Sequence, residues 1–256
     1  MVKHEFETLV RDYSPKVYNI SYRITGNRQD AEDVTQETFL QVHRNLERFR
    51  GESAIYTWIY RIAVNTSLQC KRRIDKIYID SLDETIAQFR EDVPQEVKQW
   101  ANDPETRYLY DELLGEVQKA CYHFITFRLT DEQRVVYIPR VLLDFSLDDI
   151  AAVLQIEKNT VKARLQRAKT ALGAYFSGRC QWIEGSGNCS CECGLGFALS
   201  VAPEILRRLK NLPPDEAIRT TVRKTVGKVI DIDQIYGELP LEEFQTEALE
   251  SYLKGA

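Results

Sequence analysis

The residues that most directly indicate chemistry are four cysteines in the last third of the chain, out of six in the whole sequence. They are Cys180, Cys189, Cys191 and Cys193, and a Gly-Ser-Gly stretch at 185–187 lies between the first two. In an extended chain every second side chain points the same way, so residues 189, 191 and 193 would share one side. A turn at the glycines would bring Cys180 back to them. This all-sulfur set predicts a site for a soft metal ion, Cu(I), Zn(II) or Cd(II).

The same cysteines could instead form a structural zinc site, a redox disulfide or a set of inert thiols, and the sequence leaves these roles open. The spacing differs from the C-x₂-C of a zinc ribbon, which argues against a purely structural zinc. The C-x-C-x-C run suits low-coordinate copper at least as well. Cys70 lies on the apolar stripe of an expected helix, so we expect it in the core.

The elements that must position these residues are expected to be helices. Apolar residues recur at helical spacing over 3–25, from about Asp30 to Arg48 and from about Ser53 to Arg73, and Gly26-Asn27 separates the first two segments. Asp30 is the expected cap of the second helix. A further helical unit covers about 111–176. The predicted fold is all-α, with domains at 1–75 and 111–177, a linker at 76–110 and a Cys-rich, partly helical extension at 178–256.

Charge is distributed unevenly along the chain, whose net charge is −5. Residues 80–116 hold eleven acidic and three basic residues, so the remainder of the chain is mildly basic. We therefore interpret 76–110 as an acidic linker, partly helical, between two modules that can meet nucleic acid.

The first module carries a basic face on its third helix. On a helical wheel Arg61, Asn65 and Arg72 lie opposite the apolar stripe, where they suit DNA phosphates and base edges, although a solvated basic face would have the same pattern. The sequence motifs of this module are more specific than the basic face alone. It reads Asp30-Ala-Glu-Asp33-x-x-Gln36-Glu37-x-Phe39, then Phe49-Arg-Gly-Glu-Ser53, then Thr57-Trp58-Ile-Tyr-Arg61-Ile-Ala-Val-Asn65.

Over residues 5–74 these motifs resemble region 2 of the ECF type of RNA polymerase sigma factors. The resemblance implies a polymerase-docking surface with Asp33, Gln36, Glu37 and Phe39. It implies that the 50–56 loop captures a flipped base of the −10 promoter element, and that the following helix contacts −10 DNA. The residues assigned to −10 DNA are Arg50, Ser53, Tyr56, Trp58, Arg61, Asn65, Arg72 and Arg73. Trp58 would be a stacking platform or, alternatively, a core anchor.

The second module has the pattern of a helix-turn-helix. Ser146 and Asp149 resemble a capping box, the helix after them is expected to end near Leu154, and Asn159 or Thr160 can cap a second, basic helix. The run Thr160-Val-Lys162-Ala-Arg164-Leu-x-Arg167-Ala resembles sigma region 4. The resemblance implies that this helix reads the −35 element through Lys158, Asn159, Thr160, Lys162, Arg164 and Arg167.

Two positions depart from the region 4 pattern. Gln155 stands where the turn usually carries Gly, so a left-handed non-Gly residue is expected there. Asn159 replaces the usual Gly before the Thr. The acidic linker would occupy a polymerase channel built for nucleic acid, or would be a solvated tether, and both interpretations stay open.

The cysteine-rich end resembles the extension of the CorE-like group of ECF sigma factors, which respond to metal. Gly178-Arg-Cys180 and Asn188-Cys189-Ser-Cys191 keep that frame, but its two prolines are missing and Cys193 is added. The resemblance makes Cys121 a further candidate ligand. For residues 195–256, an apolar stripe of Leu241, Phe244, Ala248 and Leu249 suggests a tail that folds onto a DNA- or polymerase-binding face, or else a dimerisation or structural element.

Taken together, the sequence predicts an alternative sigma factor regulated by metal, with core RNA polymerase and promoter DNA as partners. An anti-sigma factor would be a further partner if the extension is not the regulator. The alternative is a stand-alone metal- or redox-responsive helix-turn-helix regulator. No enzyme activity and no organic cofactor are expected, because His4, His43 and His123 are scattered and no Gly-rich phosphate loop occurs. No apolar run approaches about 18 residues and the N-terminus lacks a signal-peptide core, so we expect no membrane association and a cytoplasmic location.

Overall fold

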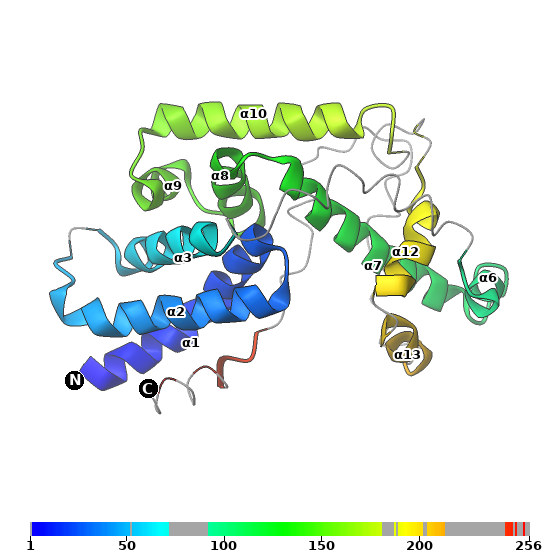
Figure 1. Ribbon diagram of the computed structural model, residues 1–256, viewed down its shortest axis with the longest axis horizontal. Coiled ribbons are helices and arrows are strands. Elements are labelled where there is room, and N and C mark those ends of the chain that lie inside the picture. Colours follow the sequence, from blue (N-terminus) through cyan, green and yellow to red (C-terminus); the bar gives the residue numbers. More distant parts are fainter. Residues whose placement is uncertain are drawn as a thin grey trace. The chain divides into compact units, whose positions relative to one another are not determined.

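The computed structural model describes residues 2–51, 53–71, 92–180, 187, 189–201, 204–212, 244–247, 249 and 253. Over these residues every regular element is a helix (Figure 1). The one extended contact among them is an isolated bridge between Cys180 and Cys189. The predicted all-α fold is therefore confirmed. None of the helices in this described part of the chain combines the length and the apolar character that a membrane span requires.

The chain divides into two compact units. The first contains Met1–Asp75, Thr126–Ala171 and Tyr236–Ala256, and the second contains Lys76–Ile125 and Leu172–Ile235. These units are defined by contacts in space. The boundaries predicted at 75, 110 and 177 divide the sequence into modules, and they stay predictions. The first unit thus combines most of both predicted DNA-binding modules with the C-terminal tail.

Three helices form one half of the first unit: α1 (Val2–Thr25), α2 (Arg28–Asn45) and α3 (Ile55–Lys71), with the short 3-10 helix η1 (Leu46–Arg48) after α2. They lie side by side (Figure 1). They share a core in which several aliphatic and aromatic side chains are fully buried. These include Val17, Ile20, Ile24, Phe39, Val42 and Ile59. The three-helix core expected from the apolar periodicity is present.

The turn between α1 and α2 differs from the expectation in one detail. Asn27 caps α2, because its side-chain oxygen accepts a hydrogen bond from the Asp30 backbone N–H at 2.8 Å. The prediction of Asp30 as the cap was wrong. The helix begins at Arg28, and the Asp30 carboxylate accepts a hydrogen bond from the side-chain amide of Asn27. A helix that begins earlier gains hydrogen bonds while its first donors remain satisfied by the Asn cap.

The helix-turn-helix forms the other half of the first unit. It consists of η2 (Thr126–Arg128), α8 (Asp131–Leu142), α9 (Leu147–Leu154) and α10 (Lys158–Phe176), of which α10 belongs to this unit as far as Ala171. The capping box of Ser146 and Asp149 is present, and Gln155 is left-handed with φ 54° and ψ 46°. Both predictions are confirmed. The prediction that Asn159 or Thr160 caps α10 was wrong, because helical hydrogen bonds already start at the Glu157 carbonyl, 2.9 Å from the Thr160 N–H.

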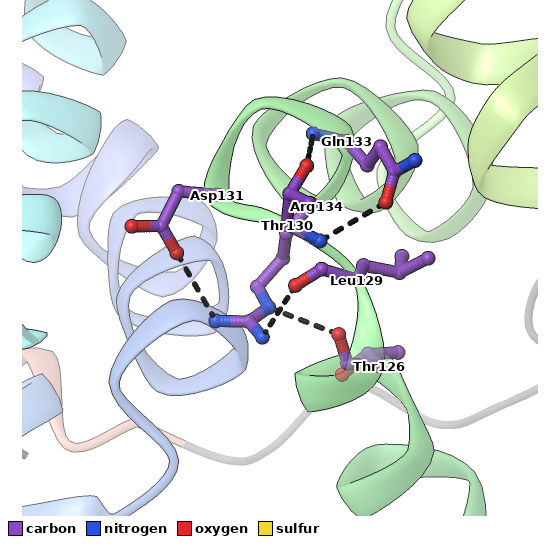
Figure 2. Close-up of polar contacts among 6 residues, drawn as sticks. All are labelled: Thr126, Leu129, Thr130, Asp131, Gln133 and Arg134. Atoms are coloured by element: carbon purple, nitrogen blue, oxygen red, sulfur yellow. Dashed lines mark hydrogen bonds and ion pairs between the residues drawn. The ribbon is translucent and has the colours of Figure 1, made fainter. Parts of the chain in front are cut away.

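A buried arginine connects η2 to α8 (Figure 2). The Arg134 side chain is 1% exposed, and its Nε and Nη2 donate to the carbonyls of Thr126 and Leu129 at 3.0 and 3.1 Å. Its Nη1 lies 3.8 Å from the Asp131 carboxylate, and its guanidinium lies 4.5 Å from the ring centre of Phe127. Burial lowers the pKa of Arg134 to about 10, which still leaves it charged at neutral pH. The Arg134 guanidinium therefore fixes η2 against the first turn of α8.

The second unit contains α6 (Gln95–Trp100), α7 (Arg107–Ile125), η3 (Cys191–Gly194), α12 (Leu195–Val201) and α13 (Glu204–Lys210). Its core includes Val97 and Trp100 with Leu113, Leu195 and Leu209. Because Val97 and Trp100 are buried, the described end of the predicted linker is packed rather than a solvated tether. Residues 76–91 of that linker lie outside the described residues.

The α1–α2 turn gives a stability prediction. Gly26 has φ +95°, and a Cβ added to it would lie 2.6 Å from the Phe127 ring. Gly26→Ala should therefore lower the free energy of unfolding by about 2–4 kcal/mol, through backbone strain and overpacking together. Gly51→Ala is the matched control, because Gly51 has φ +70° with nothing within 4 Å of its added Cβ. It should cost only about 1 kcal/mol of strain. Equal losses in urea denaturation would contradict the Gly26–Phe127 contact.

Candidate nucleic-acid interface

The predicted polymerase-docking residues lie on α2, but not all of them face outwards. Asp33 is exposed, and Gln36 and Glu37 are partly exposed. Phe39 has no exposed surface and belongs to the core shared with α1 and α3. The assignment of Phe39 to direct polymerase contact was therefore wrong for this conformation. Its aromatic side chain instead anchors the helix that presents Asp33.

The loop before α3 carries the predicted base-capturing residues. Arg50 is exposed, and Ser53 is partly exposed. Trp58 is also partly exposed and packs against Phe49, with ring centres 5.1 Å apart. One side of Trp58 joins the core cluster, so it is an anchor that keeps some ring surface accessible. Arg72 and Arg73 lie outside the described residues.

The predicted −10 face of α3 contacts α9 within the first unit. Arg61 donates from Nε to the Val153 carbonyl at 3.2 Å and from Nη2 to the Ala152 carbonyl at 2.7 Å. The Tyr56 hydroxyl donates to the Asp149 carboxylate at 2.5 Å. Asn65, one turn further along, is exposed. Two of the predicted DNA-contacting side chains are thus engaged by the helix-turn-helix.

The Asp149 carboxylate takes part both in the capping box of α9 and in the hydrogen bond with Tyr56 of α3. Hydrogen bonds from Ser146 and then from Tyr56 hold the pKa of Asp149 below its usual range. The same contact raises the pKa of Tyr56, because the hydrogen bond to the carboxylate stabilises the protonated hydroxyl. Sequence spacing predicted the Ser146 partner three residues away. It gave no signal for the Tyr56 partner, which lies 93 residues away along the chain.

The predicted −35 residues lie on the first turns of α10. Lys158, Asn159, Lys162 and Arg167 are exposed, and Thr160 is partly exposed. Arg164 is 18% exposed and forms an ion pair with Glu132 at 3.2 Å. Lys158 forms an ion pair with Asp148 at 2.7 Å. On the opposite side of the helix Val161, Ala168 and Leu172 are buried and Leu165 is partly buried, so the basic face of α10 is directed outwards.

The cysteine cluster lies in the second unit. Cys180 and Cys189 pair as bridge partners, and the Cys189 N–H donates to the Arg179 carbonyl at 2.8 Å. Cys191 and Cys193 lie in the 3-10 helix η3, which Tyr110 of α7 anchors through a hydrogen bond to Glu192 at 3.0 Å. The extended arrangement expected for residues 189–193 was therefore wrong. In a 3-10 helix, alternate side chains do not share a side.

The thiols lie close to one another, but the described residues do not form a metal site. Burial raises the pKa of the Cys191 thiol to about 12, with further contributions from the neighbouring thiols of Cys180, Cys189 and Cys193. Burial also raises the pKa of Tyr122, which is close to the thiols of Cys180, Cys191 and Cys121. Among the described residues, no group of three or more His, Cys, Asp or Glu side chains is arranged to hold a metal ion. The donor chemistry fits a soft metal, but the geometry would have to change to bind one.

The described part of the C-terminal tail packs on α1. Phe244 stacks on Tyr18 with ring centres 4.8 Å apart, Thr246 and Ser14 share a hydrogen bond at 3.2 Å, and Leu249 is buried. Leu241 and Ala248 lie outside the described residues. Because Ser14 and Tyr18 are not among the predicted site residues, these contacts do not bear out a tail that covers a DNA- or polymerase-binding face. That role stays a prediction.

Comparison with known proteins identifies both modules. The family model for Sigma-70 region 2 matches residues 9–77, and that for Sigma-70, region 4 matches residues 128–172. The RNA polymerase sigma-H factor of Pseudomonas aeruginosa is 33% identical over 174 residues, which are 66% of this chain and 85% of that protein. The ECF RNA polymerase sigma-E factor of Haemophilus influenzae is 34% identical over 172 residues, 65% of this chain and 85% of that protein.

The chain belongs to the ECF family of RNA polymerase sigma factors. Sigma factors are transcription initiation factors, so the expectation of no enzyme activity is confirmed by the family. A solved structure, CnrH in complex with the cytosolic domain of CnrY, covers 68% of this chain and 89% of its own at 18% identity and a TM-score of 0.46. The two family models stop at 77 and 172, before the cysteine cluster, so the resemblance to the CorE-like group stays a prediction.

The thiol environments give a second prediction. At pH 8, iodoacetamide should modify Cys189, which is exposed, at least about tenfold faster than Cys191, whose pKa is raised to about 12 and which therefore holds little thiolate. Peptide mass spectrometry after timed quenching measures both rates in the metal-free protein. In urea the two rates should converge, which is the control. Equal rates in the folded protein would contradict the burial of Cys191.

Proposed function

We propose that this ECF sigma factor binds core RNA polymerase and directs it to specific promoters. In this proposal, α3 and the loop before it contact the −10 element, α10 reads the −35 element, and Asp33, Gln36 and Glu37 of α2 dock on the polymerase. The observation that carries the proposal is the outward basic face of α10 in a chain with both sigma modules. Side chains of this kind on a helix-turn-helix contact phosphates and base edges in the major groove.

The presence of region 2 favours this role over a stand-alone helix-turn-helix regulator. A regulator of that kind needs no docking helix with exposed Asp33 beside partly exposed Gln36 and Glu37. We infer a cytoplasmic location from these proposed partners, core RNA polymerase and promoter DNA. An anti-sigma factor is a further partner in the event that the cysteine-rich extension is not the regulator.

Removal of one base-reading cation tests the assignment of α10. Arg167→Ala should weaken binding of the reconstituted holoenzyme to a promoter that it transcribes by about 1–3 kcal/mol, and should reduce the slope of affinity against salt by about one. The matched control is Arg11→Ala, which removes an exposed arginine of α1 that forms an ion pair with Asp12 and is not among the predicted DNA-binding residues. Filter binding at several salt concentrations gives both quantities. Equal effects of the two substitutions would contradict a specific role of Arg167.

We further propose that a soft metal ion regulates the factor through Cys180, Cys189, Cys191 and Cys193, with Cys121 as a further ligand. The all-thiol donor set and the proximity of these thiols support this proposal. A bound Cu, Zn or Cd ion would hold the thiolates together and neutralise their charge. The chain's own part is to release Cys191 and Cys193 from η3, because a 3-10 helix separates their side chains.

Metal titration of the purified full-length protein tests the regulatory site. Metal affinity, measured by elemental analysis after dialysis against a series of metal concentrations, should fall at least about tenfold in the variant with Cys189, Cys191 and Cys193 changed to Ser. Cys70→Ser, a substitution in the first unit, is the control and should bind metal like the wild type. The same titration in run-off transcription gives the sign of regulation. Unchanged metal binding by the triple variant would contradict the proposed ligands, and oxidation of Cys180 and Cys189 to a disulfide instead would favour a redox sensor.

A further inference from the structure

We propose that α9 is an intramolecular competitor of promoter DNA: it occupies the −10 face of α3 in the free protein and must leave before α3 can engage DNA. This inference rests on the proposed function and specifies how its −10 site is regulated. It concerns contacts inside the first unit, between two elements that are separated by about ninety residues of chain.

The groups that α9 presents to α3 resemble those that DNA presents. Asp149 offers a carboxylate to the Tyr56 hydroxyl, and Ala152 and Val153 offer carbonyl oxygens to Arg61. Both carbonyls belong to the last turn of α9, where helix carbonyls have no partner inside the helix and the helix dipole is negative. A negative end rich in acceptors satisfies the same donors as phosphate oxygens and base edges do. Arg61 and Tyr56 therefore cannot serve DNA and α9 at the same time.

Buried apolar side chains of the same two elements pack next to these polar contacts. Tyr60 of α3 lies 4.8 Å, centre to centre, from the ring of Phe145, the residue just before the α9 cap. Both rings are buried, and Ile150 and Val153 of α9 join the same core cluster as Ile59 and Ala63 of α3. The contact is thus a continuous interface, with a buried apolar part and a polar rim, rather than a single surface hydrogen bond.

The interface affects the two DNA-reading helices unequally. Arg61 and Tyr56 of α3 are engaged, whereas Lys162 and Arg167 of α10 are exposed. The closed state therefore keeps the −35 face accessible and withholds part of the −10 face. Since a sigma factor touches two separate promoter elements in the proposed function, the two modules have to separate for productive binding. In this proposal the polymerase binds the open state, so the apparent affinity for the polymerase falls in proportion to the open fraction.

A double-mutant cycle tests whether the polar contact exists. In urea denaturation of the full chain, Tyr56→Phe should lower the midpoint of the wild type but not that of Asp149→Ala, because the hydroxyl has then already lost its acceptor. Asp148→Ala is the matched control: Asp148 is the neighbouring carboxylate of α9 and pairs with Lys158 instead. In that background Tyr56→Phe should have its full effect. Additive effects of Tyr56→Phe and Asp149→Ala would overturn the proposal.

Binding to core polymerase tests whether the contact competes. Asp149→Ala should bind bacterial core RNA polymerase about fivefold to tenfold more tightly than the wild type, since loss of one partly exposed hydrogen bond enlarges the open fraction by about that factor. Asp148→Ala and Ser146→Ala should remain within about twofold of the wild type. Ser146→Ala is included because it removes the capping box of α9 but leaves Asp149 available to Tyr56.

The possible results distinguish failure of this inference from failure of the proposed function. Equal gains for Ser146→Ala and Asp149→Ala would show that capping of α9 matters and the contact with α3 does not, which overturns this proposal. Equal binding by all variants would overturn it while the proposed function stands. Absence of binding by every variant, wild type included, would overturn the proposed function and this inference together.

Discussion

The last turn of a helix leaves carbonyl oxygens without partners, and in this protein an arginine from another helix supplies two of the missing donors. Arg61 of α3 bonds to the carbonyls of Ala152 and Val153, and Tyr56 binds the Asp149 carboxylate nearby. The donors involved are those that a region 2 helix would offer to promoter DNA. The free energy of this contact consequently decides how much of the −10 face is available in the free protein. In our proposal, regulation of the factor depends on this balance between an internal acceptor and an external one.

The rest of the first unit holds both partners of this contact in place. Arg134 is buried against the carbonyls of Thr126 and Leu129, and Phe127, which it covers, fills the space beside Gly26 at the end of α1. An unpaired buried cation would be strongly destabilising, so its carbonyl partners and the Asp131 carboxylate are needed to keep it there. This anchor ties η2 and α8 to the α1–α2 turn at one end, while α9 meets α3 at the other.

Features set by neighbouring residues could be predicted from the sequence, whereas those set by distant contacts could not. The capping box of Ser146 and Asp149 and the left-handed Gln155 depend on spacing within one turn, and both were predicted correctly. The wording of the two motifs was sufficient to identify the sigma modules. Phe39 was assigned to the surface because its motif gave it a place beside Asp33, but the packing of α1 and α3 buries it. The Tyr56–Asp149 contact joins residues 93 positions apart, for which periodicity and spacing carry no information. Likewise, η3 forms through anchoring on α7, so the extended cysteine run was a wrong prediction.

The cysteine-rich part has the donor atoms that a soft metal ion prefers, but its described residues do not form a ligand set, and we propose a sensor there rather than a permanent structural site. Its proposed regulatory role and the proposed competition between α9 and DNA both presuppose that the chain acts as a sigma factor. The most direct test is genome-wide run-off transcription with the purified chain and bacterial core RNA polymerase, followed by sequencing of the transcript ends. Our account predicts new start sites that share two separated sequence elements and are absent with core polymerase alone. Transcripts indistinguishable from those of core polymerase, with and without added copper or zinc, would contradict it.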